Sequence, residues 1–398
     1  MSRKTRRQFL KQSMLLPPAA ALAQLAWFDK PAFGHEALDR PIVVKSPANV
    51  RQTEILFDPA CYTAFPHVVR LNAKELLISF RQAPRQALVR HTHPRSLITV
   101  MRSYDLGQTW DENNATQMAA GGGQELGLIN LGNGHIGGLL AMHEVVPVAE
   151  AQRAGFPPST SHEYPCGSVG GFWCWSNNYG LSWKLHHNVL FAPGFHPCAP
   201  PIRLESGTIL APCYGSTEKG EFASAKVYRS TDQGKTWSSP TVMAAGSPTT
   251  RAYFEPAILE IEPNHILAMH RIGDSRTPAD DVFWRNESRD GGLTWSPVVD
   301  TGIVSGACPR LTKLSDKRIL LTYGRRFEPY GLFARLSEDG GKSWSETSWL
   351  LRKAPNGNQG YSSTVEIEPG RLFTACYAQN DAAVTGITGT FWDLPKHR

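Results

Sequence analysis

One eight-residue pattern, Ser-x-Asp-x-Gly-x-Ser/Thr-Trp, occurs five times and constrains the fold more than any other feature of the chain. Its copies begin 73, 54, 58 and 49 residues apart, a spacing typical of four-stranded propeller blades with loops of different length. In each copy the acidic side chain can cap its own turn, the glycine can adopt positive φ and the tryptophan can close an apolar layer between repeats. The pattern therefore predicts hairpin turns in a repeating all-β fold, with structural roles for Asp105, Asp232, Asp290 and Asp339. The copies are residues 103–110, 176–183, 230–237, 288–295 and 337–344, the second with Asn178 in the Asp position.

A second repeat lies between these copies and consists of an apolar strand, a short turn and another apolar strand. Its six copies predict a six-bladed β-propeller that occupies residues 35–398 as one domain. The last blade is expected to end near residues 386–394, with residues 41–57 supplying its closing strand. A β-sandwich is the alternative, but it does not require a hairpin repeat in step with a tryptophan-bearing turn. The copies are residues 68–80, 128–142, 201–214, 257–270, 310–323 and 364–377.

The first 34 residues have the character of an export signal. The segment TRRQFLK at residues 5–11 resembles a twin-arginine signal, and a weakly apolar stretch follows at residues 14–27. Small residues at 21–23 and at 32–34 offer two cleavage positions. We therefore expect a protein that is exported already folded and is periplasmic or secreted; an ordinary basic amphipathic N-terminus is the alternative.

The net charge of +6 belongs almost entirely to this signal. Residues 1–34 hold six basic residues and one acidic residue, so the remainder has 35 basic and 34 acidic residues, a difference of +1. This balance does not support a general nucleic-acid-binding surface. No apolar run reaches the length of a membrane span, and a hydrophobic content of 41% excludes a disordered chain.

The seven cysteines form no C-x-x-C pair, so neither a zinc site nor a redox motif is predicted. Cys198 and Cys213 can face each other across a hairpin, where either a disulfide or two buried thiols would be compatible with the pattern. No metal or other cofactor is predicted.

Alignment of the six hairpins locates a candidate site. The residues at the start of the inner strands are mixed, whereas a purely structural position would repeat one apolar residue. The innermost strand of each propeller blade begins at the central channel, so these positions are expected to face a ligand. They are Phe65, Glu125, Cys198, Glu255, Cys308 and Tyr361, and sixteen residues later stand Arg81, Ala141, Tyr214, Arg271, Gly324 and Tyr377.

Several of these residues stand in recognisable short motifs. Tyr361 lies in Gly-Tyr-Ser-Ser, Glu255 in Phe-Glu-Pro-Ala and Arg271 in Met-His-Arg, while Tyr-Gly precedes Arg325 and Arg326. The five copies of the Ser-x-Asp-x-Gly-x-Ser/Thr-Trp pattern are Asp boxes. Together with them, these motifs resemble the BNR-repeat propellers of the sialidase superfamily. The resemblance implies that the Tyr attacks the anomeric carbon with help from the Glu, and that the arginines hold the substrate carboxylate. Either Arg325 or Arg326 would be the third arginine of that site.

Two parts of the sialidase pattern are missing. Ala64 stands where the family has its first arginine, and no Asp or Glu occurs between Glu75 and Asp105 to serve as the general acid. His91 and His93 are candidate proton donors, and Arg81 or Arg95 is a candidate replacement for the cation. The two histidines also have the spacing of one side of a metal site, but no third ligand follows.

These observations predict an exported glycosidase that removes a terminal, acidic sugar from a glycan. Two alternatives remain: a non-catalytic carbohydrate-binding propeller, favoured by the missing acid, and a lyase acting on a uronic acid polymer, favoured by the histidine segment. The site residues have structural alternatives as well. Tyr361 would then be a buried structural tyrosine, and Glu255 and Arg271 would form a structural ion pair. The expected substrate contacts are Arg271, Arg325, Arg326, Arg81, Arg310, Glu125 and Tyr214.

Overall fold

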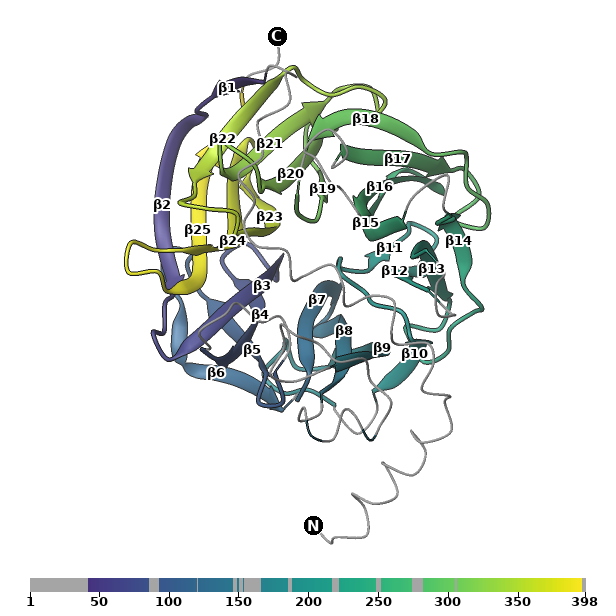
Figure 1. The fold of residues 1–398 in the computed structure, drawn as a ribbon, viewed down its shortest axis with the longest axis horizontal. Coiled ribbons are helices and arrows are strands. Elements are labelled where there is room, and N and C mark those ends of the chain that lie inside the picture. Colours follow the sequence, from purple (N-terminus) through teal and green to yellow (C-terminus); the bar gives the residue numbers. More distant parts are fainter. Residues whose placement is uncertain are drawn as a thin grey trace, which may run out of the picture.

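Six β-sheets form a ring around a central axis in the computed structural model (Figure 1). The structure describes residues 42–85, 93–119, 121–145, 149, 153, 166–184, 188–216, 222–247, 252–273, 282–304 and 306–395. The six-bladed propeller predicted from the repeats is confirmed. Among the residues so described, no helix has both the length and the apolar character needed to cross a membrane.

Each blade is built on four antiparallel strands that are arranged from the centre of the ring to its rim (Figure 1). Blade 1 contains β3 (Cys61–Arg70), β4 (Leu76–Pro84), β5 (Leu97–Ser103) and β6 (Asp111–Ala119), and blade 2 contains β7 (Gly123–Gly132), β8 (His135–Val145), β9 (Cys166–Ser176) and β10 (Val189–Pro193). Blade 3 contains β11 (Ile202–Arg203), β12 (Ile209–Gly215), β13 (Ser224–Ser230) and β14 (Thr241–Ala244), and blade 4 contains β15 (Ala252–Glu262), β16 (His265–Gly273), β17 (Val282–Ser288) and β18 (Val299–Val304). Blade 5 contains β19 (Arg310–Lys313), β20 (Ile319–Arg325), β21 (Gly331–Ser337) and β22 (Thr347–Lys353), and blade 6 begins with β23 (Gly360–Glu368), β24 (Arg371–Gln379) and β25 (Thr385–Asp393).

The N-terminal part of the described chain closes the ring. Strand β2 (Ala48–Leu56) pairs antiparallel with β25 and completes blade 6, as predicted for residues 41–57. The preceding strand β1 (Val43–Lys45) pairs parallel with β22 instead, so this segment is divided between two blades and blade 5 has five strands. Pairing of β2 with β25 thus gives blade 6 its fourth strand and joins the first and last strands of the ring.

The Asp boxes form the turns that their sequence predicts. In the third copy, Asp232 Oδ1 accepts hydrogen bonds from the backbone N of Thr236 at 2.9 Å and from Ser230 Oγ at 2.9 Å. Ser230 Oγ in turn accepts from the backbone N of Gly234 at 2.8 Å. Asn178 of the degraded second copy accepts from the equivalent backbone N at 3.0 Å. These local bonds account for the box carboxylates as turn residues.

A β-bulge recurs at the start of three inner strands and positions the site. Phe65, Glu255 and Tyr361 occupy the same place in the aligned hairpins, and all three have left-handed φ values of 60°, 47° and 49°. The strand pairing shifts register across each of them. Such conformations cost about 1–3 kcal/mol each and are concentrated at functional sites, and a bulge redirects the side chain that it carries.

Candidate active site

The bulged residues of blades 4 and 6 meet at the centre of the ring. Tyr361 Oη donates a hydrogen bond of 2.5 Å to Glu255 Oε1, and Arg271 Nη1 donates one of 2.9 Å to Glu255 Oε2. Glu255 and Tyr361 are buried, whereas the Arg271 side chain retains 21% of its exposure. The carboxylate thus joins a phenol on one side to a partly accessible guanidinium on the other.

The pKa values of Tyr361 and Glu255 are shifted in opposite directions, and this sets the protonation state of the resting pair. Burial raises the pKa of Tyr361 well above its usual range, so the phenol is neutral. Burial, the largest influence on Glu255, also raises its pKa, but Arg271 and the hydrogen bonds from Cys308 and Tyr361 outweigh it and bring the pKa down to about 2. The resting pair is therefore a neutral phenol hydrogen-bonded to an ionised carboxylate.

Two further arginines face the ring of Tyr361. The guanidinium carbons of Arg310 and Arg326 lie 5.9 Å and 5.7 Å from the ring centroid. Arg326 Nη2 also donates to the hydroxyl of Tyr377 at 2.8 Å. The guanidinium of Arg325 instead donates to the carbonyl of Glu328, in the β20–β21 connection. Of the two adjacent arginines that the sequence left open, Arg326 is the one beside Tyr361.

Glu125 of blade 2 lies in a second buried cluster, together with His67, Cys198 and Arg310. Its Oε2 is 3.1 Å from His67 Nε2 and 3.8 Å from Arg310 Nη2, and it is hydrogen-bonded to the Cys198 thiol. Burial raises the pKa of Glu125 to about 8 despite the opposing effect of Arg310, and burial lowers that of His67. The contact with His67 is therefore a hydrogen bond between neutral groups at pH 7 rather than an ion pair. The sequence interpretation missed His67, although Phe65, two residues before it, marks the same strand.

Tyr214 is also part of this central region. Its hydroxyl is hydrogen-bonded to Cys198, and its ring packs edge-on against Phe254 with centroids 5.3 Å apart. The side chain is buried, and these contacts place it beside Cys198 and Phe254.

Arg81 and Arg95 of blade 1 are the candidates to replace the missing first arginine, and they lie at different positions. Arg81 is paired across the strands with Ala64 and is buried, with Nε donating to Ser96 Oγ at 3.1 Å and the guanidinium 5.8 Å from the ring of Tyr62. It therefore brings a cation next to the alanine that occupies the position of the family's first arginine.

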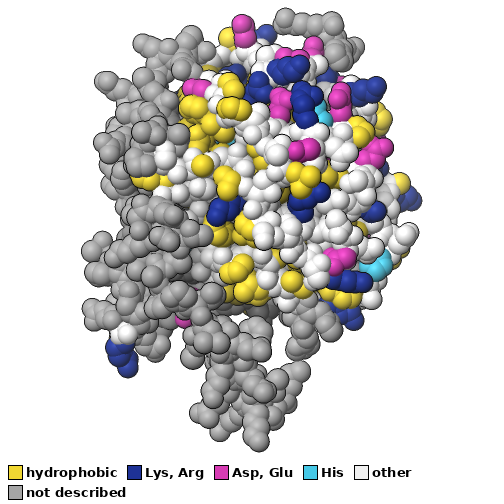
Figure 2. Space-filling model, turned by 90° about the vertical axis from the view of Figure 1, so that its right-hand side faces the viewer, with side chains coloured by type: hydrophobic (Ala, Val, Ile, Leu, Met, Phe, Trp, Pro, Cys, Tyr) yellow, Lys and Arg dark blue, Asp and Glu magenta, His cyan; other side chains and the backbone are white. Residues whose placement is uncertain are grey.

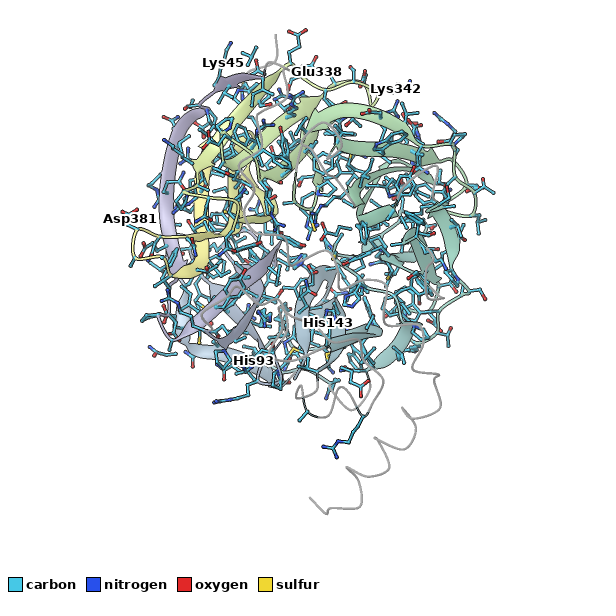
Figure 3. The ribbon with its side chains drawn as sticks, in the orientation of Figure 1. Lys45, His93, His143, Glu338, Lys342 and Asp381 are labelled. Atoms are coloured by element: carbon cyan, nitrogen blue, oxygen red, sulfur yellow. The ribbon has the colours of Figure 1, made fainter. Side chains whose placement is uncertain are left out.

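His93 is held by its own turn. Its Nδ1 accepts from the backbone N of Arg95 at 3.0 Å, and its carbonyl accepts from Ser96 and Gly122. In Figure 3 it lies farther from the centre of the ring than His143. These contacts favour a structural role for His93; His91 lies outside the described residues.

The cysteine alternatives are also resolved. Cys198 and Cys213 both carry free, buried thiols and belong to different apolar clusters. The Cys198 thiol is hydrogen-bonded to Cys308, which lies outside its own hairpin. Proximity across the sequence hairpin was a poor guide because side chains at the centre contact the neighbouring blades.

The model of the BNR repeat-like domain family matches residues 159–374, which is more than half of the chain. The chain belongs to the BNR repeat-like family. Its propeller and repeats are sialidase-like, as the Asp boxes had indicated. No curated protein sequence matches at a significant level.

Several solved structures share the fold of this BNR-repeat propeller at low sequence identity. A protein of unknown function from Dyadobacter fermentans DSM 18053 superimposes with a TM-score of 0.73 and 20% identity over 87% of this chain and 100% of that one. The Hadza microbial sialidase Hz136 gives 0.61 and 19%, over 84% of this chain and 66% of that one. An α-L-arabinanase from Penicillium chrysogenum, complexed with arabinobiose, gives 0.60 and 12%, over 86% and 97%. At these identities the similarity establishes the fold alone.

Proposed function

We propose that the protein is a glycoside hydrolase that removes a terminal sugar carrying a carboxylate. The observation that carries the proposal is the hydrogen-bonded line from Tyr361 through Glu255 to Arg271. A neutral phenol with a carboxylate base is suited to attack an anomeric carbon next to a negative charge, since an anionic nucleophile would be repelled.

The charges around this line favour an acidic substrate. Glu255 is the ionised carboxylate of the group, because Glu125 has a pKa of about 8 and is mainly protonated at pH 7. Several guanidinium groups surround these two carboxyls, and planar guanidinium groups bind carboxylates in bidentate geometry. The surplus is positive, as a site for an anion requires. The arginines are Arg271, Arg310 and Arg326.

The dual role of Arg271 would couple substrate binding to base strength. In the resting site its guanidinium stabilises the Glu255 carboxylate, which makes that carboxylate a weak base. A substrate carboxylate that binds the partly exposed guanidinium would share its charge and hydrogen bonds. The pKa of Glu255 would then rise because its burial is less well compensated, so the base would strengthen when the substrate is in place.

Glu125 is the best candidate for the missing general acid. A carboxyl group with a pKa of about 8 holds its proton at neutral pH, and two carboxyls with widely separated pKa values are the usual acid and base of such reactions. In the first step the Tyr361 oxygen would bond to the anomeric carbon, its proton would pass to Glu255, and the departing oxygen would take the proton of Glu125. Water would then cleave the tyrosyl intermediate, giving a proton to Glu125 while Tyr361 recovers its own from Glu255.

Hydrolysis of paired aryl glycosides tests this proposal. Uronides and sialosides are compared with neutral glycosides for the wild type, Tyr361→Phe and Glu255→Gln. We expect the acidic substrates to be preferred and both variants to lose about 10³-fold in kcat/KM. Tyr323→Phe is the matched control, because Tyr323 is a buried tyrosine of blade 5 whose hydroxyl contacts Ser348. Equal activity in all variants, saturable glycan binding without turnover, or an unsaturated ultraviolet-absorbing product would each refute the assignment.

We also propose that the folded protein is exported. The support is the paired Arg6 and Arg7 within the segment at residues 5–11 and the apolar stretch that follows it. The full chain, expressed in a Gram-negative host, should appear in the periplasm, and the double substitution Arg6→Lys and Arg7→Lys should retain it in the cytoplasm. Equal distribution of the two forms would contradict export by this route.

A further inference from the structure

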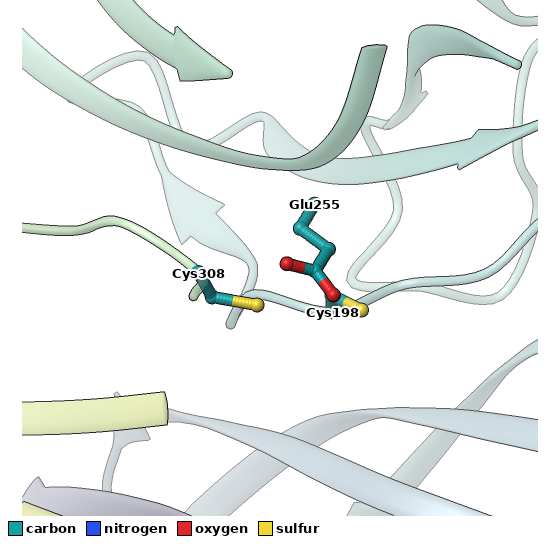
Figure 4. Close-up of side chains that lie close together, drawn as sticks. All are labelled: Cys198, Glu255 and Cys308. Carbon is teal, nitrogen blue, oxygen red and sulfur yellow. The ribbon is translucent and has the colours of Figure 1, made fainter. Parts of the chain in front are cut away.

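Two cysteines and a glutamate from three blades converge beside Tyr361. Cys198 precedes β11, Cys308 precedes β19, and Glu255 lies in the bulge of β15 (Figure 4). The two Sγ atoms and a carboxylate oxygen of Glu255 all lie within 4.8 Å of one another, and all three residues are buried. Each thiol is free and the two are hydrogen-bonded to each other.

This arrangement is close to the geometry of a tetrahedral metal site. With Zn–S distances of about 2.3 Å, two thiolates on one zinc ion lie about 3.8 Å apart, so the donors need to close by about 1 Å at most. Two sulfurs and one oxygen select a thiophilic or borderline cation rather than Mg²⁺ or Ca²⁺, which prefer all-oxygen sites. Three protein donors leave the fourth position open.

The surrounding charges are compatible with a bound dication. Burial raises the pKa of the Cys308 thiol, the nearby Arg310 opposes that effect, and Arg271 contacts Oε2 of Glu255. Deprotonation of both thiols adds two negative charges, which a divalent cation neutralises, so the balance with these two arginines is unchanged.

We propose that Cys198, Cys308 and Glu255 bind one thiophilic divalent cation, with Zn²⁺ as the fitting ion, at the centre of the propeller. This metal site is a property beyond the proposed hydrolysis, and a bound cation would inhibit that reaction. Since the cation takes the carboxylate that serves Tyr361 as base, metal and turnover would exclude each other. Metal binding itself requires no substrate and no activity.

Metal titration of the reduced, full-length protein tests the site directly. After removal of metals with a chelator, Co²⁺ is added and its visible absorption and sulfur-to-metal charge-transfer band are followed, and Zn²⁺ is then used to displace it. We expect one equivalent with a tetrahedral thiolate spectrum. Cys198→Ser, Cys308→Ser and Glu255→Gln should each weaken binding by more than about 100-fold, because changes merely outside the ligand shell already cost 10–100-fold.

Cys376→Ser is the matched control, since Cys376 is an equally buried free thiol in blade 6. It should bind the metal as the wild type does. Near-ultraviolet circular dichroism of the metal-free variants checks their folding, and Cys198→Ala serves as the second variant if the serine does not fold.

No stoichiometric binding by the folded wild type, equal binding by the folded cysteine variants, or a Cys198–Cys308 disulfide that persists in reductant would overturn the proposal. Because the readout is spectroscopic, loss of glycosidase activity cannot be mistaken for loss of the metal site. Conversely, a protein that binds Co²⁺ but hydrolyses no glycoside would refute only the proposed function.

Discussion

Removal of the Arg271 charge tests the electrostatics of the site most directly. Arg271→Met keeps much of the side-chain length but leaves the buried Glu255 without its cation. In the native protein the pKa of Glu255 falls from an ordinary 4.5 to about 2. Because this pKa is depressed on folding, the ion pair stabilises the protein above pH 4.5, and that contribution is lost as pH falls through 2.

The size of the effect follows from this shift. A difference of 2.5 between 4.5 and about 2 corresponds to about 3 kcal/mol at pH 7, at 1.36 kcal/mol per pKa unit. Only about 1 kcal/mol of it remains at pH 3, where the carboxyl of the unfolded chain is already protonated. In Arg271→Met only the hydrogen bonds from Cys308 and Tyr361 oppose the effect of burial, so we expect the pKa of Glu255 to rise to 4.5 or above and the carboxyl to be neutral at pH 3 in both folded and unfolded chains.

Urea unfolding at pH 7 and pH 3 measures the difference. We expect Arg271→Met to reduce the free energy of unfolding by at least about 3 kcal/mol at pH 7, and this loss should shrink by about 2 kcal/mol at pH 3. The same substitution in a Glu255→Gln background is the control, because the titrating group is gone and the loss should not depend on pH. A pH-independent loss in the Glu255 background would refute the reasoning.

Three further predictions concern the frame and the acid. Gly234→Ala and Gly207→Ala introduce a side chain at φ values of +87° and +89°, but only at Gly234 would the new Cβ lie 2.1 Å from Trp173 Nε1. Thermal unfolding should therefore show a loss of about 1 kcal/mol for Gly207→Ala and a clearly larger loss for Gly234→Ala. Asp232→Ala removes the bonds of one Asp box and should cost about 1–3 kcal/mol of stability in urea titrations while leaving kcat unchanged; a large fall in kcat would contradict a purely structural box. Glu125→Gln should abolish the fall in kcat/KM that we expect as pH rises through about 8, and an unaltered pH profile would exclude Glu125 as the acid.

The propeller fold could be predicted from the sequence because each blade repeats the same local structure. Asp-box turns and inner hairpins depend on short-range bonds, so five boxes in step with six hairpins determine both the fold and which residues occupy equivalent positions. That equivalence correctly predicted that Tyr361, Glu255 and Arg271 come together, although they are up to 106 residues apart in the chain.

Contacts between blades could not be predicted in the same way. Nothing in the local sequence distinguishes Arg326 from Arg325, since their different partners depend on where the β20–β21 connection and blade 6 lie. The neighbour of Cys198 was likewise decided by blade 5, which brings Cys308 to it from outside its own hairpin.

The two glutamates of the ring show why residue type alone did not assign chemistry. Glu125 and Glu255 occupy the same position in the aligned hairpins and are equally buried, so burial raises both pKa values. Arg271 lies 2.9 Å from Glu255 and reverses the effect, whereas Arg310 is 3.8 Å from Glu125 and does not. One frame position thus yields a carboxylate and a carboxylic acid, which is the asymmetry that acid–base catalysis requires. Because the difference depends on one well-placed guanidinium, loss of Arg271 should make the two sites alike and remove the base while leaving the propeller intact.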